Sequence, residues 1–288
     1  MARGIVFLLA VAAGVLIWDE RTPGQARDAS SVLAATRDAL GGEKNLTAVK
    51  TFVATGRTRQ LRGNNLVPIE FEINCELPDK YVRKDEFPAQ DTDVTVSGFR
   101  GDALILGPQP PGGRGGPPPA QRLMTVKQDF ARLMLGAFAT SFPGYPLTFK
   151  YAAEGEAPEG KADILDVAGP PPFAARLVIQ RDTHLPVMLM WQAPGPPPGG
   201  RAGGPPGASR AGVPAPAGAP PAPTGPSPAP GGPPLENRLY FADYRDVRGT
   251  RWPFRIRRAV AGDTIEETTF DRVNINVKID PKKFEAPK

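Results

Sequence analysis

The residues that could do chemistry are few in this chain. Among 288 residues there is one histidine, His184, and one cysteine, Cys75. A nucleophile needs a base beside it, and most zinc sites need several histidine or cysteine ligands. His184 lies in an expected turn without a partner in the sequence, and Cys75 lies among apolar residues, where a thiol is ordinarily inert. We therefore expect no catalytic residue, no metal ligand, no cofactor and no enzymatic activity.

Three acidic residues and one tripeptide also invite a functional interpretation. Glu154, Glu156 and Glu159 lie in an expected loop, with no sign of an acid paired with a base in a pocket. Residues 100–102 read Arg-Gly-Asp, an adhesion tripeptide, but a turn centred on glycine explains them. No glycine-rich loop follows a strand and opens a helix, so a phosphate-binding loop is not indicated.

Four arginines crowd a short segment near the C-terminus, at positions 251, 255, 257 and 258. On the polar side of a strand they could hold lipid head groups or an acidic partner, although a solvated face is the simpler interpretation. The net charge of +5 is mild, and acids and bases are interspersed. This distribution argues against a nucleic-acid groove.

The clearest structural pattern is the stretch from Val67 to Leu77, VPIEFEINCEL. Apolar residues take every second position, which is the period of a β-strand and does not fit a helix. The opposite face carries three glutamates and cannot pack cheaply against a second layer. The pattern predicts an antiparallel sheet covered on one side only.

The remaining elements are predicted from the same periodicities. A helix is expected over Asp28 to Val49, broken at Gly41-Gly42, and a second over Gln121 to Phe138, with Lys127, Gln128 and Arg132 off its apolar face. The other expected strands are 51–61, 81–87, 93–99, 102–106, 147–153, 162–167, 175–180, 185–192, 237–247, 251–257, 265–270 and 273–279.

The N-terminal segment predicts export. Arg3 precedes the apolar run Ile5 to Trp18, and Gly24-Gln25-Ala26 supplies small residues for cleavage, so 1–26 is predicted to be a signal peptide. The run is short for a membrane-spanning helix, which needs about 20 apolar residues, so an uncleaved anchor is the less favoured alternative.

Two segments rich in proline and glycine, 108–119 and 193–234, are predicted to be disordered. The second lies between two predicted strands. Because the cost of closing a loop grows only logarithmically with its length, we interpret it as a long hairpin loop inside one domain, residues 27–288.

Five stretches, in this order, resemble a known family. They are ALGGEKNLTAVKTFVATGR (Ala39 to Arg57), ELPDKYVRKDEF (Glu76 to Phe87), RLVIQRDTHLPVMLMW (Arg176 to Trp191), YFADYRDVRGTRWPFRIRR (Tyr240 to Arg258) and VNINVKIDPKKF (Val273 to Phe284). Together they resemble the LolA/LolB-like superfamily of bacterial outer-membrane lipoprotein-sorting proteins, in a divergent periplasmic branch. The resemblance implies a mainly β, curved and incomplete antiparallel barrel with helices across its concave face. It also implies a periplasmic location and a greasy ligand held between sheet and helices.

These expectations define a candidate site on the apolar inner face. The residues expected to contact a ligand are Phe71, Ile73, Leu123, Phe130, Leu133, Met134, Trp252, Phe254 and Ile256. The function predicted is a non-catalytic carrier of a lipid or lipidated protein, acting as a monomer and without nucleic acid. Two alternatives stay open: an ordinary filled core, since apolar stripes usually mean core, and an envelope scaffold that contacts a partner protein through its Pro/Gly-rich loops.

Overall fold

The structure is a computed structural model that describes residues 28–88, 94–107, 117–195 and 232–286. The predicted signal peptide, 1–26, lies outside these residues, as do most of the two Pro/Gly-rich segments. The elements, in chain order, are α1 (Ala29–Ala39), α2 (Glu43–Ala48), β1 (Thr51–Arg62), β2 (Asn65–Glu76), β3 (Lys80–Glu86), β4 (Val94–Arg100), β5 (Ala103–Leu106), α3 (Pro119–Phe138), β6 (Thr148–Ala157), β7 (Gly160–Ala168), β8 (Ala174–Gln180), β9 (Pro186–Gly195), β10 (Gly232–Val247), β11 (Thr250–Val260), β12 (Asp263–Ile275) and the 3-10 turn η1 (Pro281–Phe284).

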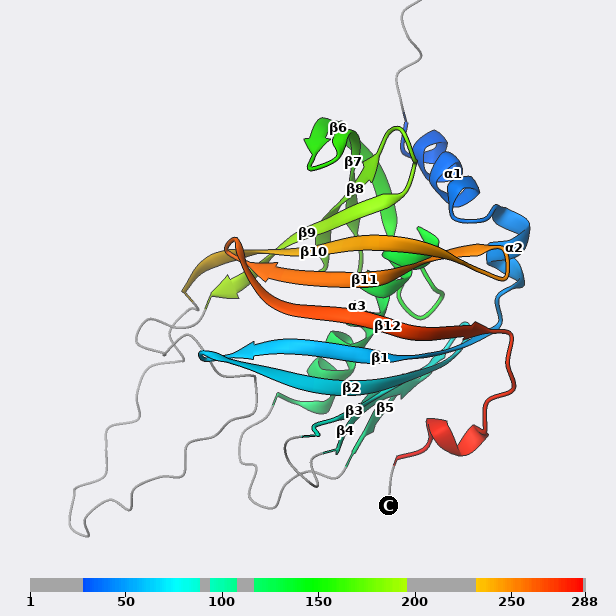
Figure 1. The fold of residues 1–288 in the computed structure, drawn as a ribbon, viewed down its shortest axis with the longest axis vertical. Helices are drawn as coiled ribbons and strands as arrows, with labels where there is room; N and C mark the ends of the chain where they lie inside the picture. Colours follow the sequence, from blue (N-terminus) through cyan, green and yellow to red (C-terminus); the bar gives the residue numbers. More distant parts are fainter. Residues whose placement is uncertain (1–27, 89–93, 108–116, 196–231, 287–288) are drawn as a thin grey trace, which may run out of the picture.

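The twelve strands form one antiparallel sheet in the order β5-β4-β3-β2-β1-β12-β11-β10-β9-β8-β7-β6. β5 and β6 are its two edges and do not pair with each other, so the barrel stays open. Helix α3 connects these edges along the chain and lies behind the central strands in Figure 1. The expected fold class, a curved incomplete β-barrel with a helix across its concave face, is confirmed.

The alternation in β2 places its side chains as predicted. Ile69, Phe71, Ile73 and Cys75 are all buried, whereas Glu70 between them is exposed. Opposite them on β1, Phe52 pairs with Cys75 and Ala54 pairs with Ile73, so apolar positions of neighbouring strands meet on one face. This face is the concave one, against which α3 packs.

The final strand differs from the expectation of two separate strands, 265–270 and 273–279. β12 runs without interruption to Ile275. Its register against β1 shifts between Thr55 and Gly56, because Thr55 faces Arg272 and Gly56 faces Phe270, leaving Asp271 as an extra residue. Such a bulge moves the alternation by one position, which makes one strand look like two in the sequence.

The strands on either side of the long Pro/Gly-rich segment pair with each other. β9 and β10 are antiparallel neighbours, as expected of a hairpin. The expected boundaries, 193–234, were too wide, because residues 193–195 belong to β9 and residues 232–234 to β10. Likewise Pro119 of the first segment opens α3, where a proline is tolerated because the first helical N–H has no partner.

The convex face is partly covered, which corrects the expectation of a sheet packed on one side only. Phe284 of η1 is buried against Val82 and Ile105, with Val96 and Ile279 around them. A second apolar cluster on this face is centred on three buried residues of β7 to β9, namely Ala162, Val178 and Met188. The cover also reaches the glutamates of β2, since Lys283 of η1 contacts Glu72 at 2.7 Å.

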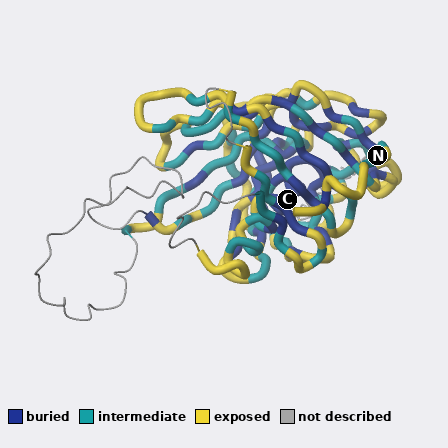
Figure 2. Tube along the Cα trace, turned by 90° about the horizontal axis from the view of Figure 1, so that it is seen from below, coloured by how far each residue is buried: buried dark blue, intermediate teal, exposed yellow. Residues whose placement is uncertain are grey.

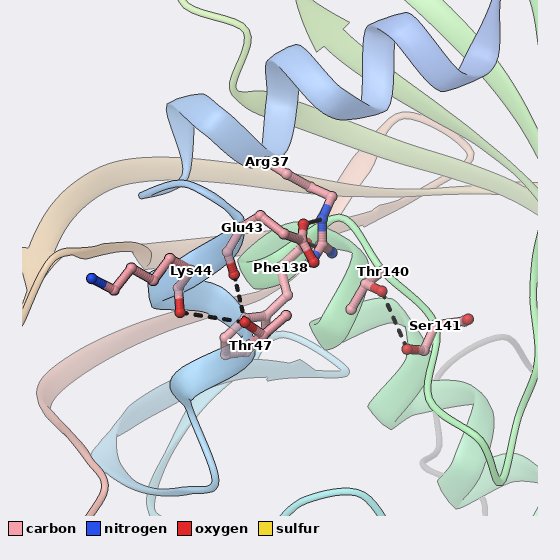
Figure 3. A network of polar contacts seen from close by, with 7 residues as sticks. All are labelled: Arg37, Glu43, Lys44, Thr47, Phe138, Thr140 and Ser141. Atoms are coloured by element: carbon pink, nitrogen blue, oxygen red, sulfur yellow. Dashed lines mark hydrogen bonds and ion pairs between the residues drawn. The ribbon is translucent and has the colours of Figure 1, made fainter.

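The C-terminal end of α3 is fastened to the N-terminal helices. Arg37 of α1 donates to Glu43 of α2 at 2.6 Å and to the carbonyl oxygen of Phe138 at 3.1 Å (Figure 3). A positive charge there also favours the negative end of the helix dipole. The Tyr244 hydroxyl, on β10, donates to the carbonyl oxygen of Gly136 at 2.8 Å.

Among the described helices, none is both long and apolar enough to cross a membrane.

An apolar core lies where these helices meet the sheet. Trp252 lies 5.0 Å from Phe52 and 5.6 Å from Phe138, ring centroid to ring centroid. We call this region the filled end of the concave face, marked by Phe52, Cys75, Trp252 and Ile275, all at most 3% exposed. Figure 2 shows the buried stretches gathered away from the ends of β9 and β10, where teal and yellow dominate.

Candidate functional site

A cavity of about 420 Å³ lies between α3 and the opposite end of the concave face. Its apolar wall is made by Ile69, Ile73, Tyr81, Phe87, Val126, Leu133, Trp191, Leu239, Ile256 and Phe270. Its polar wall is made by Thr58, Gln60, Arg62, Arg83, Asp85, Thr95, Ser97, Asp129, Arg132, Arg258, Glu266 and Thr268. We call this region the hollow end, marked by Thr58, Gln60, Arg258 and Glu266. Its volume falls in the range of roughly 300–1,000 Å³ that small-molecule sites show.

The nine residues expected to contact a ligand divide between cavity and core. Ile73, Leu133 and Ile256 line the cavity. The others lie outside its wall: Phe71, Phe130, Met134, Trp252 and Phe254 are buried in the core, and Leu123 is half-buried against it. One end of the concave face is therefore an ordinary packed core, and the other end contains a cavity. That a ligand contacts any of the nine stays a prediction.

The two ends differ because the inward positions change character along each strand. On β1 the inward residues run from Phe52 and Ala54 to Thr58 and Gln60. On β11 they run from Trp252 to Ile256 and then to Arg258. At one end Phe52 and Trp252 pack against each other, whereas at the other the inward positions of these two strands carry Thr58, Gln60 and Arg258 beside an open volume.

Arg83 is a cavity arginine whose charge is matched inside the protein. It donates to Asp85 at 2.8 Å and to the Thr58 hydroxyl at 3.3 Å, and it lies 4.8 Å from the Phe71 ring. Burial acts to lower the pKa of Arg83, but Asp85 outweighs it and the pKa is raised above its ordinary value. Arg83 is therefore a satisfied structural cation.

Glu266, across the same wall, accepts a hydrogen bond from Gln60 at 3.2 Å. Gln60 in turn accepts one from Arg62 at 2.9 Å, and the Thr58 and Thr268 hydroxyls are 2.9 Å apart. These contacts join β1 to β12 through side chains as well as backbone. This part of the polar wall is a closed hydrogen-bond network.

Arg132 and Arg258 both lie against the ring of Trp191, on the part of the cavity wall next to Glu266. Their guanidinium carbons lie 4.4 Å and 5.8 Å from the ring centroid of Trp191. Arg132 pairs at 2.6 Å with Asp129, which is 62% exposed, and Arg258 donates to the amide oxygen of Asn237 at 3.1 Å. Burial, and with it repulsion from Arg258, lowers the pKa of Arg132 against the opposing effect of Asp129.

Three buried side-chain nitrogens lack a hydrogen-bond partner among the described residues: Arg132 Nε, Arg258 Nε and Trp252 Nε1. A buried donor without an acceptor is uncommon in proteins, since it loses its water without compensation. Two of the three belong to the arginine pair on the cavity wall. The third lies at the filled end, among the rings of Phe138 and Phe270.

Three charged residues, Arg258, Lys127 and Arg132, do not lie where the sequence predicted. Arg258 does not lie on the polar outer face with Arg251, Arg255 and Arg257, because it is in phase with Trp252 and Ile256 and lines the cavity. Lys127 is not off the packed face of α3: it is 6% exposed, and its ammonium contacts Asp102 at 2.7 Å and lies 5.7 Å from the Phe99 ring.

Arg132 was also expected off the packed face of α3, and its side chain is only 14% exposed. It packs over Trp191 and Phe173. A signal for the cavity residues was present in the sequence. A charged residue in phase with buried apolar positions, as Arg258 and Arg83 are, marks a polar site on an inward face.

The other candidates lie apart from the cavity. His184 is exposed in the turn between β8 and β9, and Cys75 is fully buried with a pKa raised by that burial. Glu154 and Glu156 belong to β6 and not to a loop, and Glu154 pairs with Arg181. Among the described residues, no group of three or more histidine, cysteine or acidic side chains could hold a metal ion.

Comparison with known proteins identifies the fold. No family model matches the chain, and no curated protein matches its sequence. A LolA superfamily protein from Nitrosomonas europaea is similar over 90% of this chain and 98% of its own, with a TM-score of 0.52 and 9% sequence identity. This likeness confirms the LolA-like fold expected from the sequence.

Two further solved structures are similar over most of their length. An outer membrane lipoprotein-sorting protein domain from Vibrio parahaemolyticus matches 88% of this chain and 96% of its own, with a TM-score of 0.49 and 9% identity. A DUF1329 family protein from Desulfovibrio piger matches 89% of this chain and 96% of its own, with a TM-score of 0.44 and 8% identity.

Proposed function

We propose that this chain is a periplasmic, non-catalytic carrier or binding protein that holds the apolar part of a lipid or lipidated protein in the cavity beneath α3. The single observation that carries the proposal is the hollow end itself. A space of about 420 Å³ beside an apolar wall can bind an alkyl chain by burying its surface.

Two further observations support the proposal. The fold is LolA-like, and the sequence resemblance to that superfamily implies greasy ligands between sheet and helices. The cavity roof is built on one helix, α3, whose C-terminal end is fastened by Arg37 and Tyr244, so the roof is held in place at the filled end. A contact with an envelope partner through the Pro/Gly-rich segments concerns residues outside those described and stays a prediction.

The test is the lipid content of the protein and its dependence on cavity volume. Leu133→Trp would place a larger side chain in the hollow, and Leu66→Trp makes the same change at a side chain that is 66% exposed. We expect organic extracts of the wild type and Leu66→Trp, purified from the bacterial envelope, to contain lipid by mass spectrometry. The Leu133→Trp extract should contain much less. A wild-type protein that is always empty, or a Leu133→Trp protein that carries as much lipid, would refute the proposal.

A further inference from the structure

Four arginines line the cavity, Arg62, Arg83, Arg132 and Arg258, and they differ in how their charge is matched. Arg83 is matched by the Asp85 carboxylate at 2.8 Å. Arg258 instead meets the neutral amide of Asn237, and among the described residues no carboxylate lies within ion-pair distance of it. Arg132 has Asp129 on its outer side, where that carboxylate is 62% exposed, but the Arg132 Nε proton has no acceptor.

Arg132 and Arg258 lie directly beside the apolar wall. Leu239 on β10 is the cross-strand partner of Arg258, and Ile256 lies two residues before Arg258 on the same inward face. Leu133 follows Arg132 on α3, and it also lines the cavity. A molecule that filled the apolar part would therefore have its end next to two guanidinium groups.

The chemistry of the two guanidinium groups suits an oxyanion. Trp191 holds both by cation–π contact, which restricts their rotation before any ligand arrives. Guanidinium groups donate in a planar fork that matches the oxygens of phosphate and carboxylate. An anion between them would accept from the terminal N–H groups of both guanidinium groups and would relieve the repulsion that helps to lower the pKa of Arg132.

We propose that Arg132 and Arg258 form an anion-binding subsite in the cavity wall, and that the ligand is an amphiphile with one anionic head group, a phosphate or a carboxylate, joined to an alkyl chain. This inference rests on the proposed function, because the alkyl chain occupies the cavity already described. It adds to that function the negative charge of the ligand, the two arginines that bind the charged group, and the aromatic residue, Trp191, that positions these arginines.

The experiment compares ligands that share a chain and differ in charge. Dodecyl phosphate, dodecanol and inorganic phosphate are each titrated against the purified chain carrying an uncharged fluorescent apolar probe, N-phenyl-1-naphthylamine. The variants are Arg258→Gln and Arg132→Gln. The matched control is Arg257→Gln, which removes the next arginine of the same strand, on the exposed convex face over Tyr240. Circular dichroism checks that each variant is folded.

We expect dodecyl phosphate to displace the probe at least roughly ten times more tightly than dodecanol, since hydrogen bonds to charged groups are the stronger ones. Arg258→Gln and Arg132→Gln should each weaken dodecyl phosphate by about the same factor and leave dodecanol unchanged. Arg257→Gln should change neither. Inorganic phosphate alone should not displace the probe, which separates an amphiphile head group from a free anion.

Three results would overturn the inference. If dodecanol binds as tightly as dodecyl phosphate and the arginine variants have no effect, the charge of the ligand does not contribute to binding. The anion subsite is then refuted, while the carrier function still stands. If inorganic phosphate displaces the probe as well as dodecyl phosphate does, the subsite takes a free anion. If none of the ligands and not even the probe enters, the carrier function fails and the inference fails with it.

Discussion

The filled end and the hollow end of the concave face are built from the same strands, yet they differ in the side chains at their inward positions and in the space these leave. On β11, Trp252 and Arg258 point to the same side of the sheet. Trp252 is 1% exposed and packed among aromatic rings, whereas Arg258 borders an open volume of about 420 Å³. The difference teaches that stability and binding are separated along the strands and not between different elements.

The two ends also differ in how they treat α3. At the filled end, Gly136 lets the helix backbone approach β10 so closely that a Cβ there would lie 2.3 Å from Phe241 Cε1. At the hollow end the helix presents Val126, Asp129, Arg132 and Leu133 to open space. One helix therefore packs as core at its C-terminal end, around Gly136 and Phe138, and covers the cavity with side chains between Val126 and Leu133.

The largest expected effect is a difference in unfolding free energy between two variants of the same strand, β11. Trp252→Ala should lower the free energy of unfolding by about 3–5 kcal/mol, because it leaves a void in a close-packed region. Ile256→Ala, four residues on and half-buried at the cavity, should cost only about 1 kcal/mol. Urea unfolding measures both. Equal losses would mean that the hollow end supports the fold as much as the filled end does.

Thiol accessibility is a second contrast. Cys75 is fully buried at the filled end and its pKa is well above the ordinary value, so both access and ionisation oppose its reaction. We expect labelling of native protein by Ellman's reagent to be on the order of 100-fold slower than labelling of urea-unfolded protein.

A matched variant places the only thiol at the hollow end. Ser97→Cys in a Cys75→Ala background lies on the cavity wall and half-buried. It should react much faster than native Cys75. Protection of both thiols to the same degree would argue that the cavity is sealed from water and from reagents.

Close packing at the filled end can be tested through Gly136. Gly136→Leu should cost about 2 kcal/mol of unfolding free energy through its clash with Phe241, although leucine has the higher helix propensity. Thr125→Leu, an exposed position on the same helix, should change stability by about 0.5 kcal/mol or less. A neutral Gly136→Leu would show that the helix can lift from the sheet at this end.

The smallest expected effect concerns how the charge of Glu266 at the hollow end changes the affinity for an anionic ligand. Glu266 is the cross-strand partner of Arg258 but hydrogen-bonds Gln60 instead. Glu266→Gln removes a negative charge from the cavity and should tighten dodecyl phosphate roughly three-fold, with dodecanol unchanged. Probe displacement measures both, and a weaker dodecyl phosphate would mean that Glu266 helps to orient the arginines.

Much of the fold follows from periodicity. The alternation from Val67 to Leu77 predicts both the strand and its buried face, and the apolar spacing between Gln121 and Phe138 predicts α3. These patterns are informative because an apolar residue at a given position indicates that this position is buried. A bulge interrupts that logic: at Asp271 it shifted the phase, so one strand was predicted as two.

The candidate site was harder to predict, for a physical reason. A cavity depends on the side chains that fail to fill a space, and this depends on several strands at once. Selecting ligand contacts by apolar residue type alone gave Trp252 and Phe130, which lie in the packed core. Judging by charge alone placed Arg258 on the outer face of the sheet. Phase and charge considered together would have indicated Arg258 and Arg83, but Arg132 and Trp191 become neighbours only when α3 crosses the sheet.

The most direct test of the central claim is the position of a bound amphiphile. A crystal structure with dodecyl phosphate brominated at the end of its chain locates the chain by the anomalous signal of bromine. We predict a bromine peak inside the hollow end, among Ile73, Leu133 and Ile256, with the phosphate between Arg132 and Arg258. Bromine on the convex face, or an empty hollow end in crystals saturated with the ligand, would contradict the account.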